Sequence, residues 1–319
     1  MSATEAAKSA PPPSRMSLRN VSKGKIIQPK HVVLYGVEGI GKSTFAANAP
    51  KPIFMGAEDG TNNLDVERFP TPDGGLTWAD ALDAVRTLTS DPHDYKTLAV
   101  DTLDWLEPLL WSHICKRDGE KSIEGYGYGK GYVAALDEWR VFLAALERMS
   151  RQRGMHIVLL AHSWIRPFKN PEGEDFDRYE LKLNAKAAGL IKEWAGAVLF
   201  ANYETYANKD EKTKRVKGVS TGARLIYTTR TAAYDAKNRD DLPESLPLGW
   251  ADFAGACEDH APASAGSLKS EIERKAKTLG GAVEKQIAES MGRCAEDAAK
   301  LAKLNDWVNA KLTLNGGNQ

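Results

Sequence analysis

The chain has 319 residues, whose 43 basic and 43 acidic side chains cancel to a formal net charge of zero. This length allows one sizeable domain with appendages or two small domains. The balanced charge excludes a general attraction to nucleic acid, so any such contact must come from local patches. No run approaches the ~20 apolar residues of a membrane-spanning helix, and the N-terminus lacks the apolar block of a signal peptide. We therefore expect a cytoplasmic protein with no membrane partner.

The three cysteines are widely spaced and include no CxxC pair, which argues against a disulfide framework or a zinc site. Residues 1–27 are expected to form a disordered basic tail, because they are rich in Ala, Ser and Pro and have little apolar surface to bury. Six basic side chains face one acidic side chain over residues 1–30. Weak contact with a phosphate backbone is therefore the alternative to a simply solvated tail.

The stretch His31–Thr44, HVVLYGVEGIGKST, is typical of a P-loop, in which a short apolar strand leads into a glycine-rich turn and then a helix. The glycines let successive backbone N–H groups point inward and bind the α and β phosphates of a nucleotide. Lys42 would reach the β and γ phosphates, and the hydroxyl of Ser43 would ligate Mg²⁺. A turn that merely joins a strand to a helix would not require Gly-Lys-Ser. We expect ATP and Mg²⁺ as cofactors, held by Gly36, Glu38, Gly39, Ile40, Gly41, Lys42, Ser43 and Thr44.

Three later strands, over residues 52–55, 96–101 and 155–161, are predicted to end near polar side chains. Ligands in open α/β sheets bind at such strand ends. The second strand has the Walker B pattern, which places Asp101 in the Mg²⁺ shell. The third ends at His162, where a polar side chain can sense the γ phosphate, although a lone histidine is more often structural. Apolar spacing predicts helices over residues 78–88, 103–114 and 133–153.

Two segments combine basic and aromatic residues in the way that single-stranded nucleic acid binding requires, because bases stack on aromatic rings and phosphates pair with cations. The first is a glycine-rich loop over residues 115–132, with Lys121, Tyr126, Tyr128, Lys130 and Tyr132. The second is a loop over residues 164–179, with Trp164, Arg166, Phe168 and Lys169, although acidic residues dilute its charge. A flexible connector or a subunit contact is the alternative for the first loop.

A helix near residues 185–194 precedes a hairpin, whose strands cover residues 197–206 and 224–229 and whose tip is charged. Lys237-Asn238-Arg239 follows. The P-loop, the strand ending in Ala-Glu, the Walker B aspartate, the polar sensor and this late motif together resemble the RecA-like ATPases. The late motif is similar to that of RadA-type recombination proteins, and the whole order is similar to phage-encoded RecA-like single-strand annealing ATPases. The resemblance covers about residues 28–258.

This resemblance implies an α/β RecA-like P-loop NTPase core with a mostly parallel central sheet, a late β-hairpin and a C-terminal helical extension. It also implies site residues. Glu58 matches the glutamate that orients the attacking water, Glu38 matches an acidic P-loop position, and His162 stands where many relatives have glutamine. Lys237 and Arg239 would reach a neighbour's nucleotide as an arginine finger does, in a head-to-tail homo-oligomer, either ring or filament. The two candidate DNA loops do not match the recombinase loops in sequence.

Residues 259–319 are expected to form a linker and an amphipathic helical tail. Apolar residues step by threes and fours from Leu268 to Leu312, and Gly280-Gly281 would split the segment into two helices. This stripe needs a partner. Packing on the core is the simpler interpretation, and binding another subunit or an accessory protein, such as a single-strand binding protein, is the alternative.

These features together predict an ATP-hydrolysing protein that couples its nucleotide state to single-stranded DNA in phage recombination or annealing, inside the bacterial host cell. Two alternatives use the same core. One is a KaiC-like regulatory ATPase switch without DNA, and the other is a hexameric helicase-type motor.

Overall fold

The computed structural model describes residues 16–21, 23, 26, 28–57, 60–209, 216–259, 265–294 and 297–316. The chain divides into two compact units, one of residues 28–261 and one of residues 1–27 with 262–319. Most of the predicted disordered tail lies outside the described residues, as does Glu58. Among the helices that the structure describes, none is both long and apolar enough to cross a membrane.

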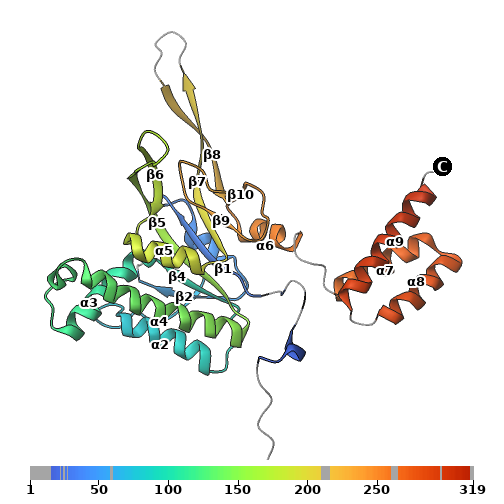
Figure 1. The fold of residues 1–319 in the computed structure, drawn as a ribbon, viewed down its shortest axis with the longest axis horizontal. Helices are drawn as coiled ribbons and strands as arrows, with labels where there is room; N and C mark the ends of the chain where they lie inside the picture. The colour runs from blue at the N-terminus through green and yellow to red at the C-terminus, as the bar shows by residue number, and fades with distance from the viewer. Residues whose placement is uncertain are drawn as a thin grey trace, which may run out of the picture. The chain divides into compact units, whose positions relative to one another are not determined.

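The described residues of the larger unit form a ten-stranded, mostly parallel sheet (Figure 1). Its main path runs β10-β8-β7-β1-β5-β4-β2-β3, while β6 pairs with β5 and β9 with β7. The strands from β7 to β3 along this path are mutually parallel. The strands are β1 (His31–Gly36), β2 (Pro52–Gly56), β3 (Glu67–Arg68), β4 (Thr97–Asp101), β5 (His156–Phe168), β6 (Phe176–Leu181), β7 (Ala197–Lys209), β8 (Val216–Tyr227), β9 (Lys237–Asn238) and β10 (Ser245–Pro247).

Helices cover both faces of this sheet, which explains why its central strands are continuous apolar runs rather than alternating ones. In β1, Val33 and Tyr35 face one core and Val32 and Leu34 face the other. The first core is closed by α2 (Trp78–Ser90), α3 (Leu103–Asp118), α4 (Lys130–Arg153) and α5 (Ala185–Trp194). The second is closed by α1 (Lys42–Ala47) and α6 (Trp250–Asp259). The predicted α/β fold class, with its parallel sheet and late hairpin, is confirmed.

The first predicted loop is shorter than expected. Helix α3 continues to Asp118, where Gly119 adopts a left-handed conformation with φ of 76°. A short 3₁₀ helix, η2 (Ile123–Tyr126), follows, and α4 begins at Lys130. The predicted helices end at residue 114 and begin again at residue 133, so the predicted loop is too long at both ends. Its glycines were taken to break the helical pattern, whereas Gly119 and Gly129 directly flank the two helices.

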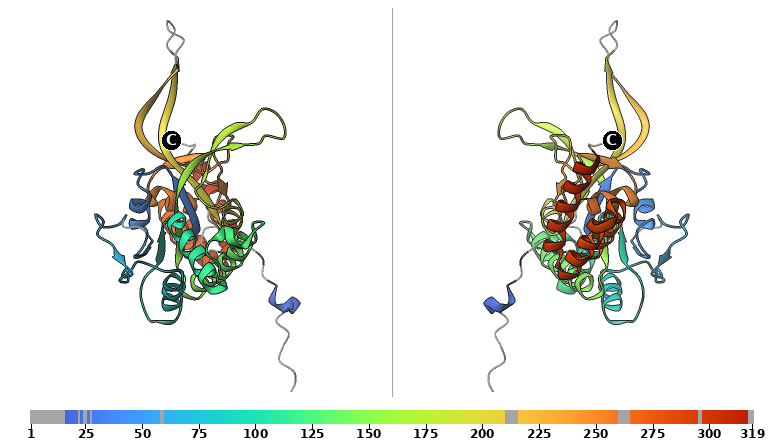
Figure 2. Two further views of the ribbon diagram at one scale, coloured as in Figure 1. Left: turned by 90° about the vertical axis from the view of Figure 1, so that its left-hand side faces the viewer. Right: turned by 90° about the vertical axis from the view of Figure 1, so that its right-hand side faces the viewer.

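The second predicted loop was wrong, because residues 163–181 form an antiparallel hairpin, here called the β5–β6 arm. Ladder pairs run from Ser163 opposite Leu181 to Phe168 opposite Phe176. Pro167 and Gly173 had indicated a loop. Pro167 is tolerated because this part of β5 is an edge strand, where a missing N–H breaks no ladder bond. The β5–β6 arm and the β7–β8 hairpin both extend beyond the body of the sheet, and they diverge in the side views (Figure 2).

The smaller unit contains three described helices rather than the two predicted. They are α7 (Ala265–Leu279), α8 (Gly281–Cys294) and α9 (Ala298–Gly316). Their apolar side chains pack on one another around Leu268, Ile272, Ala276, Ile287, Leu301 and Val308. The stripe that was expected to need the core or another protein as partner is therefore covered within this unit itself.

Gly36→Ala is expected to destabilise the larger unit by roughly 1–3 kcal/mol, the usual cost of overpacking. A Cβ at residue 36 would lie 2.2 Å from the carbonyl oxygen of Ala201, so the backbones of β1 and β7 would have to separate. Denaturant unfolding measures the loss. Gly189→Ala is the control, because its Cβ would meet nothing within 4 Å and alanine in a helix is favoured by about 0.5–1 kcal/mol. Equal stability of the two variants would contradict this packing.

Candidate nucleotide-binding site

The glycine-rich turn at the end of β1 has the backbone conformation that the motif requires. Gly39 and Gly41 have φ of 69° and 112°, in the left-handed region that glycine occupies without strain. Gly41 precedes α1, and no side chain caps the first turn of that helix. Its N–H groups are thus available to an anion at a helix N-terminus. The side chain of Ile40 is fully buried in the second core, so this residue offers the turn only its backbone.

The ammonium group of Lys42 lies over this turn. Its side chain is almost fully buried, and Nζ donates to the carbonyl oxygens of Val37 at 3.0 Å and Gly36 at 3.3 Å. A buried charge held by carbonyl groups of the loop is well placed to pair with a phosphate that enters it. Glu38 and Thr44 are exposed at the rim of the same turn.

The two predicted Mg²⁺ ligands are in direct contact. The hydroxyl of Ser43 donates to Oδ2 of Asp101 over 2.6 Å, and the carboxylate is buried at the end of β4. These hard oxygen donors suit Mg²⁺. The described residues hold no group of three or more His, Cys, Asp or Glu side chains that could bind a metal.

His162 lies beside the P-loop, where it is the ladder partner of Gly36. Asp104, in the first turn of α3, accepts from the backbone N–H of His162 with one oxygen and contacts Nδ1 with the other, each at 2.9 Å. Burial acts to raise the pKa of the Asp104 carboxyl, but the hydrogen bonds from His162 outweigh burial and the pKa lies below its usual value. The carboxylate is therefore ionised beside the ring.

A second buried carboxyl group, Glu107, stands one helical turn beyond Asp104 on α3. Burial raises its pKa to about 7, although it accepts a 2.9 Å hydrogen bond from the backbone N–H of Asn184, which acts in the opposite direction. Asn184 caps the start of α5, so Glu107 ties α3 to that helix. Sequence reasoning missed this group. The available signal was its position, three residues after Asp104 among the buried leucines of α3.

Among the first DNA-binding candidates, Tyr126 and Tyr132 are only partly exposed. The hydroxyl of Tyr126 donates to the carbonyl of Ile114 and to Asp118, which holds this ring against α3. Tyr132 packs edge-on against Trp111 at 5.6 Å. Tyr128 is fully exposed, and Lys121 and Lys130 in the same segment are exposed as well. Of the three tyrosines, the structure therefore leaves Tyr128 free to stack on a base.

Three of the second set of candidates, Trp164, Arg166 and Phe168, share one face of the β5–β6 arm, because alternate residues of a strand point the same way, and Lys169 follows the end of β5. The guanidinium of Arg166 lies 4.5 Å from the centroid of the Trp164 ring, and Phe168 packs on Phe176 at 5.2 Å. Arg166 and Lys169 are exposed. The arm extends from β5 and diverges from the β7–β8 hairpin (Figure 2), whereas the first set of candidates lies between α3 and α4 in the chain.

Lys237 has a structural role within its own chain that the sequence did not suggest. Its Nζ donates to the carbonyl oxygens of Lys192, Glu193 and Ala195, at 2.7–2.8 Å, and so caps the C-terminus of α5. Burial, followed by the charge of Arg239, lowers the pKa of this amine. The finger role predicted for Lys237 is not supported by this placement. Arg239 is exposed, and no ion pair holds it among the residues that the structure describes.

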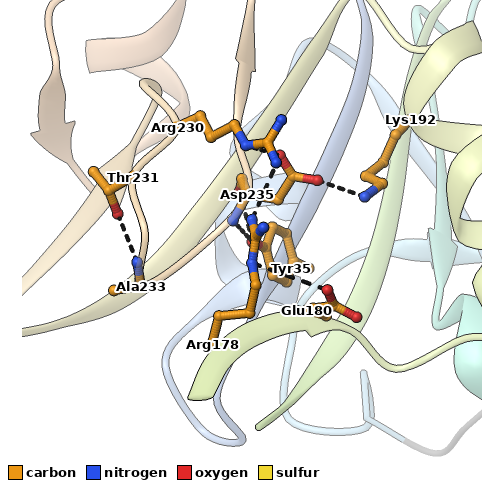
Figure 3. Close-up of polar contacts among 8 residues, drawn as sticks. All are labelled: Tyr35, Arg178, Glu180, Lys192, Arg230, Thr231, Ala233 and Asp235. Atoms are coloured by element: carbon orange, nitrogen blue, oxygen red, sulfur yellow. Dashed lines mark hydrogen bonds and ion pairs between the residues drawn. The ribbon is translucent and has the colours of Figure 1, made fainter. Parts of the chain in front are cut away.

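Asp235 joins the segment that carries this motif to the strand that enters the P-loop (Figure 3). Its carboxylate pairs with Lys192 and lies within 4 Å of Arg178 and Arg230. The backbone carbonyl of Asp235 accepts a hydrogen bond from the hydroxyl of Tyr35 at 2.6 Å. The backbone N–H of Asp235 donates to the hydroxyl oxygen of Tyr35 at 3.0 Å. Tyr35 is fully buried and precedes Gly36, so the two segments are bonded directly beneath the P-loop.

A protein family described as AAA domain matches residues 28–240, which lie within the larger unit. No curated protein matches the sequence. Among solved structures, the crystal structure of the RadB recombinase is similar with a TM-score of 0.39 and 11% identity, over 70% of this chain and 90% of that chain.

Proposed function

The chain belongs to the AAA-domain family, and we propose that this P-loop ATPase couples its nucleotide state to single-stranded DNA in phage recombination or annealing. The proposed nucleotide binding rests on one observation. The hydroxyl of Ser43 contacts Asp101 next to the ammonium group of Lys42, so a cation suited to phosphate and two proposed Mg²⁺ ligands lie close together. Mg²⁺, when bound there, would neutralise charge that develops on the phosphates.

The remaining residues have distinct proposed roles. Glu58 would orient the attacking water as its general base. His162 would contact the γ phosphate, which its position opposite Gly36 supports. Gly36, Gly39 and Gly41 would supply the turn whose N–H groups bind the phosphates.

We propose that single-stranded DNA binds along the face of the β5–β6 arm that carries Trp164 and Arg166. This face combines a ring with a cation within 4.5 Å, which is the pairing that stacking on bases and contact with phosphates require. Tyr128, Lys121 and Lys130 would provide a further contact. The net charge of zero makes such local contacts necessary.

We propose that the chains assemble head to tail and that Arg239 enters a neighbour's nucleotide site. Asn238 pairs with Ala197, which in turn pairs with Val32, four residues before Gly36. At about 3.3 Å per strand residue, the motif lies well below the P-loop of its own chain. An exposed arginine there has access to a second chain rather than to its own phosphates.

Lys42→Ala should lower ATP turnover by roughly 10²-fold or more, the effect of losing one preorganised charge-stabilising group. Lys285→Ala, an exposed lysine of α8, should leave turnover unchanged. Turnover is measured by phosphate release with and without single-stranded DNA, which should stimulate the wild-type chain. No stimulation would favour the regulatory switch without DNA, and ATP-driven strand separation would favour the helicase-type motor. Normal turnover in Lys42→Ala would contradict the site itself.

Trp164→Ala should weaken single-stranded DNA binding by roughly 5- to 150-fold, the range of one lost stacking contact. Arg166→Ala should also reduce the salt dependence of binding, by a slope of about 0.7 for one lost phosphate contact. Fluorescence anisotropy of a labelled oligonucleotide at several salt concentrations measures both. Ile165→Ala is the matched control, because Ile165 lies between them on the opposite face and is 59% exposed. Equal weakening by all three would show that the face has been misassigned.

Arg239→Ala should retain ATP binding by the isolated chain yet lose ATP-dependent assembly and turnover together. Mixing this variant with Lys42→Ala should restore activity, because one chain then supplies an intact finger and the other an intact nucleotide site. Light scattering confirms assembly, and Arg86→Ala, which removes an exposed pair with Asp83, is the control. Mixed assemblies that form but stay inactive would count against a finger acting between chains.

A further inference from the structure

The carboxylate of Asp104 has no role in the site proposed above, yet both of its oxygens contact His162. One oxygen accepts from the backbone N–H of His162 and the other lies 2.9 Å from Nδ1. The side chains of Asp104 and His162 are 3% and 12% exposed, so solvent does not compete strongly for these contacts. The two hydrogen bonds fix both the backbone of β5 at His162 and the orientation of its ring.

We propose that Asp104 is a positioning residue that turns the ring of His162 so that Nε2 faces the terminal phosphate of ATP. The inference rests on the proposed role of His162. Nδ1 is occupied by Asp104, and Nε2 has no partner among the residues that the structure describes. The position of His162 opposite Gly36, at the start of the P-loop, brings this free nitrogen to the phosphate-binding edge.

The chemistry of the contact also requires the carboxylate. A fully ionised phosphate oxygen only accepts hydrogen bonds, so Nε2 must carry a proton to bind it, while Nδ1 keeps its proton toward Asp104. The proton on Nδ1 needs an acceptor, and the Asp104 carboxylate lies 2.9 Å from that nitrogen. Asp104 therefore supplies both the orientation of the ring and the acceptor for Nδ1–H.

Other ionisable groups stand on the elements packed against His162, but their described contacts are made elsewhere. On β4, Asp101 accepts from Ser43, and after β1 the ammonium of Lys42 donates to carbonyls of the P-loop. Glu107 on α3 accepts from the backbone of Asn184. Lys182, after β6, meets His162 through its backbone N–H, which donates to the carbonyl of His162.

The test compares Asp104→Asn, which keeps the shape and removes the charge, with Asp83→Asn, an exposed aspartate of α2. Asp104→Asn should leave ATP affinity within about threefold and lower kcat roughly 10- to 100-fold, as for a lost hydrogen bond to a charged group. Asp83→Asn should change neither quantity. A loss of ATP affinity in Asp104→Asn as large as its loss of kcat would indicate a merely structural carboxylate and overturn the proposal.

A second measurement does not depend on turnover or on the stability of the variant. Long-range ¹⁵N NMR of the nucleotide-free wild-type chain, with His162 assigned by its loss in His162→Gln, should show a protonated Nδ1. A ring protonated on Nε2 alone would overturn the proposal. Turnover of His162→Gln separates the proposed role of His162 from that of Asp104. A wild-type rate in His162→Gln would contradict the role of His162 itself. A slow rate in His162→Gln together with a normal rate in Asp104→Asn would contradict only the role of Asp104.

Discussion

The parallel alignment of β1, β5, β4 and β2 is the constraint on which the whole site depends. In this register Gly36 stands beside His162, and Asp101 stands beside Gly56. Because these parallel strands reach the same edge of the sheet, Asp101 at the end of β4 and His162 on β5 come to one place with the P-loop that follows β1. β5 lies between β1 and β4, so the hydroxyl of Ser43 reaches Asp101 from the start of α1 rather than from an adjacent strand. A shift of one residue in any of these strands would separate the groups.

The sequence predicted this edge well because the signal is local and uniform. A strand buried on both faces is a continuous apolar run, and the first polar residue after it marks the sheet edge, which located Asp101 and His162. The β5–β6 arm was harder to predict, because Pro167 indicates a loop unless its strand is known to be an edge.

The start of α9 was also missed. The carboxylate of Asp297 caps the first turn of this helix, accepting from the N–H of Lys300, but the apolar spacing continues across the break between α8 and α9 and hides it.

Contacts between distant segments that belong to no recognised motif could not be predicted. The three carbonyl groups that hold Lys237 belong to the end of α5, more than forty residues earlier in the chain. Nothing in the sequence of the Lys237-Asn238-Arg239 motif indicates that the C-terminus of α5 binds its lysine. Tyr126 likewise has the composition of a stacking residue, and only the fold shows that its hydroxyl is bound to α3. Composition identifies what a side chain can do, and packing decides which of those roles remains.

The nucleotide and DNA surfaces proposed here are connected by one uninterrupted strand. β5 runs from the core through His162 into the arm, so only Ser163 separates the residue beside the P-loop from Trp164. Its backbone is held on both sides of that junction, by Asp104 at the N–H of His162 and by Lys182 at its carbonyl. In the function proposed above, a phosphate bound by the ring acts on a strand with little freedom to absorb the change locally. Because the arm is a ladder of paired residues, a rotation at His162 would move the proposed stacking face as a unit, which is the physical route that this proposal offers from ATP to DNA affinity.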